Sequence, residues 1–315
     1  MRPIHHALAL SLTTPLTFFV LVFTLLVCVS SAFAQAPPPL FDIRAIPGDT
    51  TFEGGGTIGY MGPTGDAGGS FDLNVVFGVG LSPSQQAVFT GAEAFWENKI
   101  TGYKPGISRS SITLHASAPF IDGPGDVLGR AGPTITTNQG GFTLATTGIM
   151  KFDSADVANL ENSGSLLDVI LHEMGHVLGI GTLWNLNNVY ANNTGNYTGA
   201  AGLARWKTEY NRPGDTTVPV ELEGANPGTA NGHWNEEFKG SADTGITDSM
   251  GRDMRNELMT GWLNTPTHLA DFTVQSLADI GFEVVPEPGT AGMALLAMLT
   301  IAAAGSRRVG HTSRA

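Results

Sequence analysis

The sequence is poor in cysteine and in charge, and each shortage excludes classes of protein. Cys28 is the only cysteine among 315 residues and lies in an N-terminal apolar run, so a chain cut beyond that run has neither a disulfide nor a thiolate metal ligand. Charged residues make up only 14% of the chain, which argues against a helical bundle or a coiled coil. With 16 Lys and Arg against 28 Asp and Glu, the net charge of −12 argues against nucleic acid or an anionic lipid surface as the main partner.

The first 34 residues have the layout of a secretory signal peptide. Arg2 precedes the apolar run, and the small-residue pattern at 32–34 follows it, so residues 1–34 are predicted to be cleaved off before Gln35. A membrane-anchoring first helix is the alternative, but it gives no reason for a small-residue cleavage pattern. We therefore expect the protein to be secreted.

The C-terminal segment, residues 286–315, has a second processing pattern. It begins with Pro-Glu-Pro and continues through an apolar stretch at 291–304, which is followed by the basic pair Arg307 and Arg308. The stretch is shorter than the about 20 residues that span a bilayer, so contact with the membrane is expected to be transient. The order of features resembles the PEP-CTERM sorting tail of Gram-negative bacteria. That resemblance implies an exosortase-type sorting machinery as partner and delivery to the cell surface or extracellular matrix.

Between these ends, one domain is predicted after an irregular segment. Residues 35–70 are rich in Gly and Pro and are predicted to form an irregular lead-in, whereas residues 71–285 are predicted to form the folded domain. Ser82 and Pro83 precede apolar residues at helical spacing, which is typical of a helix start. The elements predicted in order are a strand over 71–77, a helix over 82–99, and strands over 111–115 and 148–153.

A further helix is predicted over residues 165–178. Ser165 and Asp168 have the spacing of a capping box, and Gly179 can adopt the left-handed conformation that ends a helix. Its apolar residues cover nearly every side, so the helix is expected to be buried. Ionisable residues on a buried helix need a functional reason to be there.

This helix carries the pattern His-Glu-x-x-His. His172 and His176 are four residues apart, so both imidazoles project from one face and can bind a single zinc ion. Glu173 lies beside the metal without being a ligand, where it can take a proton from water. Two core histidines with ordinary hydrogen bonds are the alternative, but the helical context and the secretory signal favour a catalytic zinc site.

A catalytic zinc site usually has three protein ligands, and the third is not set by the helix. No Asp or Glu lies between Glu173 and Glu209, which disfavours a carboxylate ligand soon after the helix. The pattern His-Glu-x-x-His-x-x-Gly is found in metzincins, but Thr182 stands where their next histidine usually follows. The histidines that remain in the body are two downstream and one upstream, His233, His268 and His115.

At this point the chain resembles the leishmanolysin-like zinc metallopeptidases, a metzincin family, over about residues 71–284. The resemblance is carried by the His-Glu-Met-Gly-His-Val-Leu-Gly run at 172–179, a long insertion, His233-Trp234, and Glu257-Leu258-Met259-Thr260. It implies that His172, His176 and His233 bind zinc, that Glu173 is the general base, and that Met259 forms a supporting Met-turn beneath the metal. Gly179 provides the turn that ends the active-site helix.

Rivals exist for two of these assignments. His268 is the rival of His233, and Met250 and Met254 are the rivals of Met259. The chain also departs from the family, whose members are cysteine-rich and have a pro-segment with a zinc-blocking cysteine. A mature chain without cysteine cannot be kept inactive by a thiol.

The sequence therefore predicts a zinc metalloendopeptidase that acts on protein or peptide substrates. The implied fold is α/β (α+β) and metzincin-like, with a mixed sheet and the active-site helix above a cleft and an irregular, partly helical C-terminal half below it. The alternative is a non-catalytic surface or exopolysaccharide-matrix binding protein with a structural or degenerate zinc site. Against it, a structural site has no need of Glu173.

Two expectations concern the loops. The insertion between Gly179 and His233 is rich in Asn and Gly and is expected to face the substrate. Calcium binding is conceivable in that insertion or at 122–126, where oxygen ligands are plentiful, although no EF-hand spacing occurs.

Overall fold

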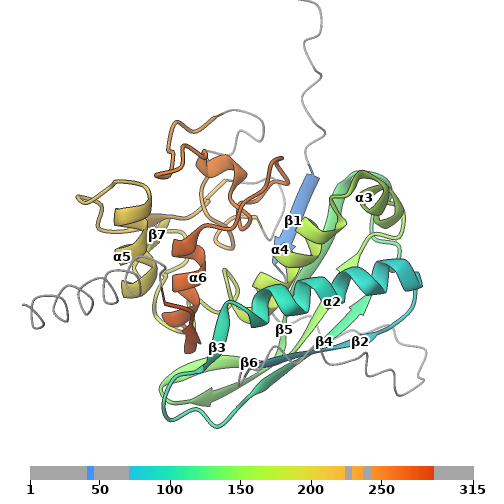
Figure 1. The fold of residues 1–315 in the computed structure, drawn as a ribbon, viewed down its shortest axis with the longest axis horizontal. Coiled ribbons are helices and arrows are strands. Elements are labelled where there is room, and N and C mark those ends of the chain that lie inside the picture. Colours follow the sequence, from blue (N-terminus) through green and yellow to red (C-terminus); the bar gives the residue numbers. More distant parts are fainter. Residues whose placement is uncertain (1–40, 46–70, 224–228, 237–242, 287–315) are drawn as a thin grey trace, which may run out of the picture. The chain divides into compact units, whose positions relative to one another are not determined.

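The computed structural model describes residues 41–45, 71–223, 229–236 and 243–286 (Figure 1). The predicted signal peptide lies outside the described residues, and so does the predicted sorting tail apart from Pro286. In the described ranges, no helix has both the length and the apolar character that crossing a membrane requires.

A five-stranded mixed sheet forms one layer of the fold, with the strand order β1-β5-β6-β4-β2. The pairs β1/β5, β4/β6 and β2/β4 are parallel, and β5/β6 is an antiparallel hairpin. The bounds are β1 Phe41–Ala45, β2 Asp72–Phe77, β4 Ser111–Ser117, β5 Asp126–Gln139 and β6 Phe142–Phe152. The mixed α/β class is confirmed, but the predicted irregular lead-in contains strand β1.

The hairpin of β5 and β6 is the largest part of the sheet that the sequence patterns do not predict. Gly132 and Pro133 within β5 argue against a regular strand, and the pairing register does shift just after Pro133. The sequence does mark the turn with the pair Gly140-Gly141, and both glycines adopt positive φ, of 58° and 86°. That two-glycine turn also explains why β6 begins before the predicted residue 148.

Three helices accompany the sheet: α2 (Pro83–Glu97), α3 (Val157–Ser163) and α4 (Leu166–Leu178). Ser82 caps α2 through a complete capping box with Gln85, and Pro83 occupies the first turn as predicted. The indole nitrogen of Trp96 on α2 donates to the Leu171 carbonyl on α4, at 3.1 Å. The two helices therefore pack against each other (Figure 1).

The predicted helix over 165–178 is confirmed as α4, but its predicted cap is wrong. Ser165 has helical dihedral angles, φ −90° and ψ −7°, and its side chain makes no capping hydrogen bond. The reason is that α3 ends only one residue earlier, at Gly164, so the Ser165 amide already donates to Leu160 of α3. Gly179 ends α4 in the left-handed conformation, as expected.

After Gly179 the chain forms short elements: β7 (Asn196–Tyr197), α5 (Ala200–Glu209), β8 (Val218–Pro219), a 3-10 turn η1 (Met254–Asn256), α6 (Asp271–Ala278) and β9 (Phe282–Val284). Strand β9 pairs antiparallel with β3 (Ile100–Tyr103), which joins the end of the domain to its first half. Helix α5 packs against α6 and buries Trp206 completely. Much of the insertion that is expected to face the substrate is thus part of a packed core, because its aromatic side chains are buried there.

Candidate metal centre

Helix α4 places two histidines on one buried face. His172 and His176 have Nε2 atoms only 2.9 Å apart, and their side chains are 1% and 0% exposed. Strands β5 and β6 pack against the same helix, so the histidines lie in the interior of the domain. The spacing of four residues is what brings the two rings together.

His233 joins them from a distant part of the chain. Its Nε2 lies 3.1 Å from Nε2 of His172 and 3.0 Å from Nε2 of His176. The neighbouring residue, Trp234, pairs with Val220 on one side and Thr260 on the other, which fixes the segment that carries the histidine. The structure therefore brings together a group of three buried histidines that could hold a metal ion.

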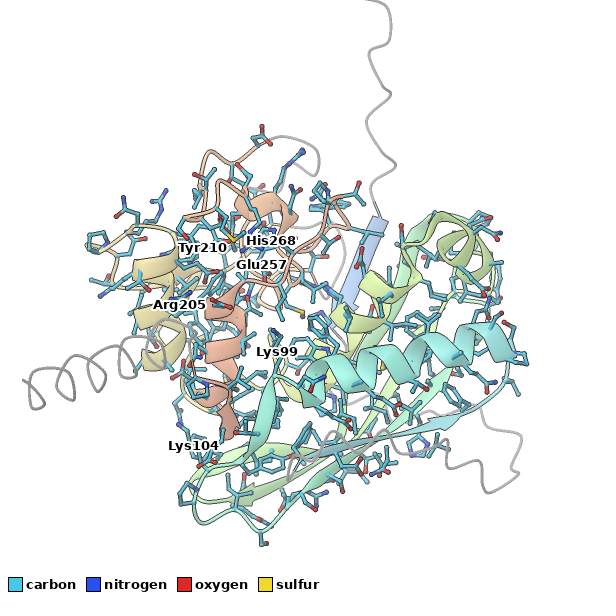
Figure 2. The ribbon with its side chains drawn as sticks, in the orientation of Figure 1. Lys99, Lys104, Arg205, Tyr210, Glu257 and His268 are labelled. Carbon is cyan, nitrogen blue, oxygen red and sulfur yellow. The ribbon has the colours of Figure 1, made fainter. Side chains whose placement is uncertain are left out.

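The two rival histidines lie elsewhere. His268 pairs through its backbone with Glu257 (Figure 2), and burial, together with the charge of Arg252, lowers its pKa to about 4. His115 lies on β4, and burial lowers its pKa as well. Neither belongs to the group of three.

Backbone carbonyls fix the tautomer of each ring in the group. The Nδ1 atoms of His172, His176 and His233 lie 2.6, 2.9 and 2.9 Å from the carbonyl oxygens of Leu258, Ile180 and Thr229. A carbonyl oxygen only accepts, so each Nδ1 carries the proton and each Nε2 carries a lone pair. Three lone pairs that face one another within 3.1 Å repel unless a cation lies between them.

Burial keeps the helical histidines neutral. It lowers the pKa of both His172 and His176 well below the ordinary value, and the neighbouring histidines of the group lower it further. Metal ions bind neutral imidazole, so these ligands need not release a proton near neutral pH. The residues therefore fit a divalent metal, although imidazole nitrogen also suits Cu, Fe and Ni and does not identify the ion.

Glu173 follows His172 on α4, and its carboxylate lies against strand β5. Its side chain is fully buried, and a Cβ atom built on Gly129 would lie 2.7 Å from its Oε1. Glycine at this position lets the strand come this close without displacing the carboxylate. Gly129 was missed as a site residue, and a glycine inside a strand was the one signal that could have found it.

Met259 packs beneath helix α4, between its two histidines. A Cβ atom on Gly175 would lie 2.6 Å from Met259 Sδ, so the thioether contacts the helix backbone at that glycine. The rival Met250 is 75% exposed, and Met254 is buried where its amide bonds to Ile246 instead. Gly175 was not singled out from the sequence, because nothing local reveals that a side chain from elsewhere presses on it.

The turn after α4 serves the site directly. Gly179 has φ 116°, and the turn it permits returns the Ile180 carbonyl to the ring of His176. Thr182, which stands where metzincins usually have a histidine, donates its hydroxyl to the His176 carbonyl at 2.6 Å. It therefore supports the helix end and leaves the third position to His233.

The loop at 122–126 is closed by acidic side chains. One carboxylate oxygen of Asp153 accepts from the amides of Ile121, Asp122 and Gly123, and Asp156 accepts from Gly125. Among the described residues, the three histidines are the one group of three or more His, Cys, Asp or Glu with metal-binding geometry. Calcium binding stays a prediction.

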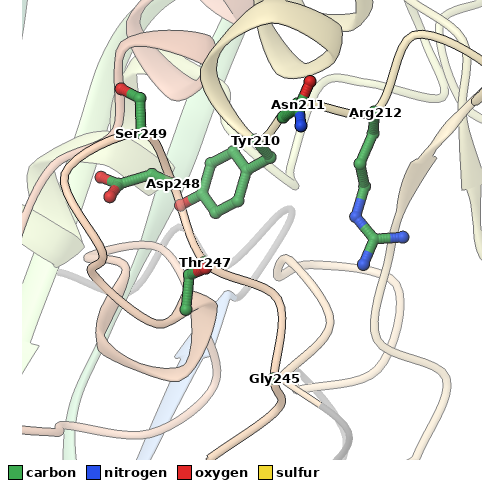
Figure 3. Close-up of a pocket in the computed structure, with 7 residues that line it drawn as sticks. All are labelled: Tyr210, Asn211, Arg212, Gly245, Thr247, Asp248 and Ser249. Carbon is green, nitrogen blue, oxygen red and sulfur yellow. The ribbon is translucent and has the colours of Figure 1, made fainter.

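A pocket of about 470 Å³ lies away from these residues (Figure 3). Its lining is polar and comes from the end of α5 and the loop before η1: Tyr210, Asn211, Arg212, Gly245, Thr247, Asp248 and Ser249. It includes neither a histidine of the group nor Glu173. The substrate cleft beside the metal group stays a prediction.

Comparison with known proteins adds no assignment to this geometry. No family model matches the chain, and no curated protein matches it significantly. The resemblance to leishmanolysin-like peptidases therefore stays a prediction.

Proposed function

We propose that this protein is a zinc-dependent endopeptidase with a metzincin-like fold of the leishmanolysin type. The observation that carries the proposal is the convergence of three Nε2 lone pairs, from His172, His176 and His233, beside a carboxylate on the same helix. Three imidazole ligands are typical of catalytic zinc, which keeps a fourth position open.

Each residue of the site has a separate role in the proposed mechanism. Zinc, when bound, supplies a Lewis acid that polarises the scissile carbonyl and acidifies water. Glu173 accepts the proton from the attacking water and then donates it to the leaving amine. The carbonyls of Leu258, Ile180 and Thr229 hold the three rings in the binding tautomer, and Met259 supports the helix from below.

The setting of the reaction is also part of the proposal. The features of residues 1–34 and 286–315 support secretion from a Gram-negative bacterium, sorting by an exosortase-type machinery, and location at the cell surface or in the extracellular matrix. The substrates are proteins or peptides of that environment. Membrane contact is confined to the C-terminal segment before it is processed.

One observation favours the second candidate, a matrix-binding protein with a structural metal site. The three histidines and Glu173 are at most 1% exposed, and catalysis requires water and substrate to reach them. However, a structural zinc site is usually closed by a fourth protein ligand, and the described group contains three. A non-ligand glutamate beside three histidines is what hydrolysis requires.

The test compares the chain from Gln35 with its Glu173→Gln variant. We expect about one zinc per chain in both proteins by elemental analysis, and chelator-sensitive cleavage of an unfolded protein by the wild type only. Loss of a positioned general base typically costs about 10²–10⁴-fold in rate. Glu161→Gln, on α3 outside the site, is the matched control and should cleave as the wild type does.

Three results would contradict the proposal in different ways. Equal cleavage by wild type and Glu173→Gln would remove Glu173 from the mechanism. Bound zinc without cleavage by either protein would favour the structural site, and absence of metal from the wild type would overturn the metal centre.

A further inference from the structure

The Leu258 carbonyl that orients His172 lies in a segment with almost no regular structure. Residues 257–259 follow directly after the short turn η1. The Leu258 amide donates to the His268 carbonyl at 2.8 Å, and the Met259 carbonyl accepts from Trp234 at 3.0 Å. Something must hold this bend in place, because the carbonyl has to meet the His172 ring at 2.6 Å.

The carboxylate of Glu257 makes the contacts that hold the bend. It is 1% exposed, and its Oε2 accepts from the Met259 amide, two residues ahead, at 2.6 Å. Its Oε1 accepts from the Ala270 amide at 3.1 Å and from the Thr273 hydroxyl at 2.7 Å. The chain is thus folded back around Leu258 and anchored to the start of α6.

The same network reaches the segment of the third histidine. The Thr273 hydroxyl that donates to Glu257 accepts from the indole nitrogen of Trp234 at 2.9 Å. Trp234 is adjacent to His233 in sequence, and its amide donates to the Met259 carbonyl. One buried carboxylate therefore links the support of His172 with the segment that carries His233.

We propose that Glu257 is a positioning residue of the metal centre, which fixes the relative placement of His172 and His233 through the Leu258 carbonyl and the Thr273–Trp234 bridge. The inference rests on the metal-binding part of the proposed function and does not depend on peptide hydrolysis. It gives a role in metal affinity to a side chain that lies outside the group of three histidines and whose hydrogen bonds reach none of their rings.

The substitution Glu257→Gln tests this with little change in shape. A carboxylate accepts at both oxygens, whereas a glutamine amide accepts at one and donates at the other. In either orientation, the NH₂ group of the variant faces a donor, either the Met259 amide or the pair formed by Ala270 and Thr273. The bend at Leu258 should therefore shift while the core stays filled.

Glu209 provides a matched control. It is also a buried glutamate, 5% exposed, and its two oxygens accept from the Asp271 and Phe272 amides at the same end of α6, at 3.0 and 2.8 Å. Neither of these hydrogen bonds reaches residues 257–259 or the segment of His233. Glu209→Gln should therefore weaken the anchoring of α6 without moving the metal ligands.

The experiment is run at about pH 8, above the pKa of about 7 to which burial raises Glu257, so that its carboxylate is ionised. It measures zinc affinity by chelator competition and the visible absorption of the Co²⁺-loaded full chain, which reports ligand geometry. We expect Glu257→Gln to lower zinc affinity by about 10–100-fold and to alter the cobalt spectrum, as is typical when a supporting group of a metal ligand is lost. Glu209→Gln should keep the wild-type affinity and spectrum. Thr273→Val, which removes the bridge to Trp234, should lower affinity in the same direction by less.

Each outcome decides one question. If Glu257→Gln and Thr273→Val both bind zinc and cobalt as the wild type does, the inference is overturned and the proposed metal centre stands. If Glu257→Gln does not fold, Thr273→Val alone decides, and wild-type affinity there overturns the inference. If the wild type binds neither metal, the proposed function is overturned first.

Discussion

The domain holds its metal group between two regions of different construction. Residues 71–178 form long elements, among them the 14-residue strand β5 and helices α2 and α4 of 15 and 13 residues. The described residues from 179 to 286 form short ones: helix α5 has 10 residues, and strands β7 and β8 have two each. The first region contributes His172 and His176 by helical spacing, and the second contributes His233 by tertiary contacts.

The difference shows how backbone amides find hydrogen-bond partners in a region with few paired strands and few long helices. In the second region, carboxylates accept from main-chain amides that start its helices. Asp279 accepts from Ala201 and Gly202 at the start of α5, and Glu209 accepts from the first amides of α6. Carboxylate side chains thus replace part of the backbone pairing that β5 and β6 obtain from each other.

The largest expected effect breaks the link between the two regions. His233→Ala removes the one ligand that the irregular region contributes, so we expect zinc affinity to fall by well over the about 100-fold that follows loss of a merely supporting group. His268→Ala is the control, since that ring lies outside the group of three. Chelator competition on both variants measures the effect, and a larger loss in His268→Ala would reassign the third ligand.

The next prediction contrasts a buried carboxylate of each region through pH. Burial raises the pKa of Asp153, but four backbone amides, from Ala155, Asp122, Gly123 and Ile121, lower it more, so the net shift is downward. Burial dominates at Glu257 and raises its pKa from 4.5 to about 7, against hydrogen bonds from Thr273 and backbone amides. The two carboxylates should therefore contribute to stability with opposite dependence on pH.

The signs follow from which state binds the proton more tightly. Asp153 is more acidic when folded, so its contribution is present above its ordinary pKa and is lost as pH falls through the folded value. Below about pH 7, Glu257 stays mostly protonated in the folded state, while the same side chain of the unfolded chain ionises above its ordinary pKa of 4.5. The wild type should thus lose on the order of 3 kcal/mol relative to Glu257→Gln as pH rises from about 4.5 to 7.

Urea unfolding of the metal-free wild type, Asp153→Asn and Glu257→Gln over this range provides the measurement. The difference between wild type and Asp153→Asn should shrink in acid, and the difference from Glu257→Gln should change in the opposite sense. Parallel stability curves for all three proteins would show that neither carboxylate has a shifted pKa.

The smallest expected effect compares two helical glycines. A Cβ on Gly91 of α2 would meet no atom within 4 Å, so Gly91→Ala should stabilise the protein by about 0.5–1 kcal/mol. A Cβ on Gly175 of α4 would meet Met259 Sδ at 2.6 Å, so Gly175→Ala should destabilise it by about 1–3 kcal/mol in spite of the same helix propensity. Thermal unfolding of each variant measures both.

A double variant sharpens this comparison. If the thioether is the cause, Gly175→Ala should cost less when Met259 is already replaced by Ala, because the two changes share one contact. Equal costs in both backgrounds would mean that Met259 does not press on the helix at Gly175.

Periodicity and capping predicted the regular region well where the signals were local. Strands β2 and β4 and helices α2 and α4 all lie where alternation, helical spacing and the Ser82-Pro83 start indicated. Strand β5 was missed because glycines and Pro133 hide a strand whose stability comes from its neighbours. The Ser165 cap was wrong because helix α3 ends too close to it, which the spacing of Ser165 and Asp168 could not reveal.

The site, like the fold, was predictable where its residues lie close together in the sequence. The spacing of His172, Glu173 and His176 is a local pattern, and the choice of His233 needed the resemblance, since elimination alone left three histidines. The carbonyl partners of the rings, the approach of Gly129 to Glu173 and the contacts of Glu257 depend on segments up to 86 residues apart. A local sequence pattern contains no information about contacts between segments so far apart in the chain.

The position of β1 has a further consequence for any chain that would extend the sheet. Strand β5 has partners on both sides, β6 and β1, and residues Phe41–Ala45 pair with its Asp126–Ala131 stretch, which includes Gly129 beside Glu173. An extended peptide that is to pair with this stretch must therefore displace a strand of the same molecule. Because this strand belongs to the same chain, it competes intramolecularly, and a free peptide with no better contacts would have to match its effective concentration to take its place.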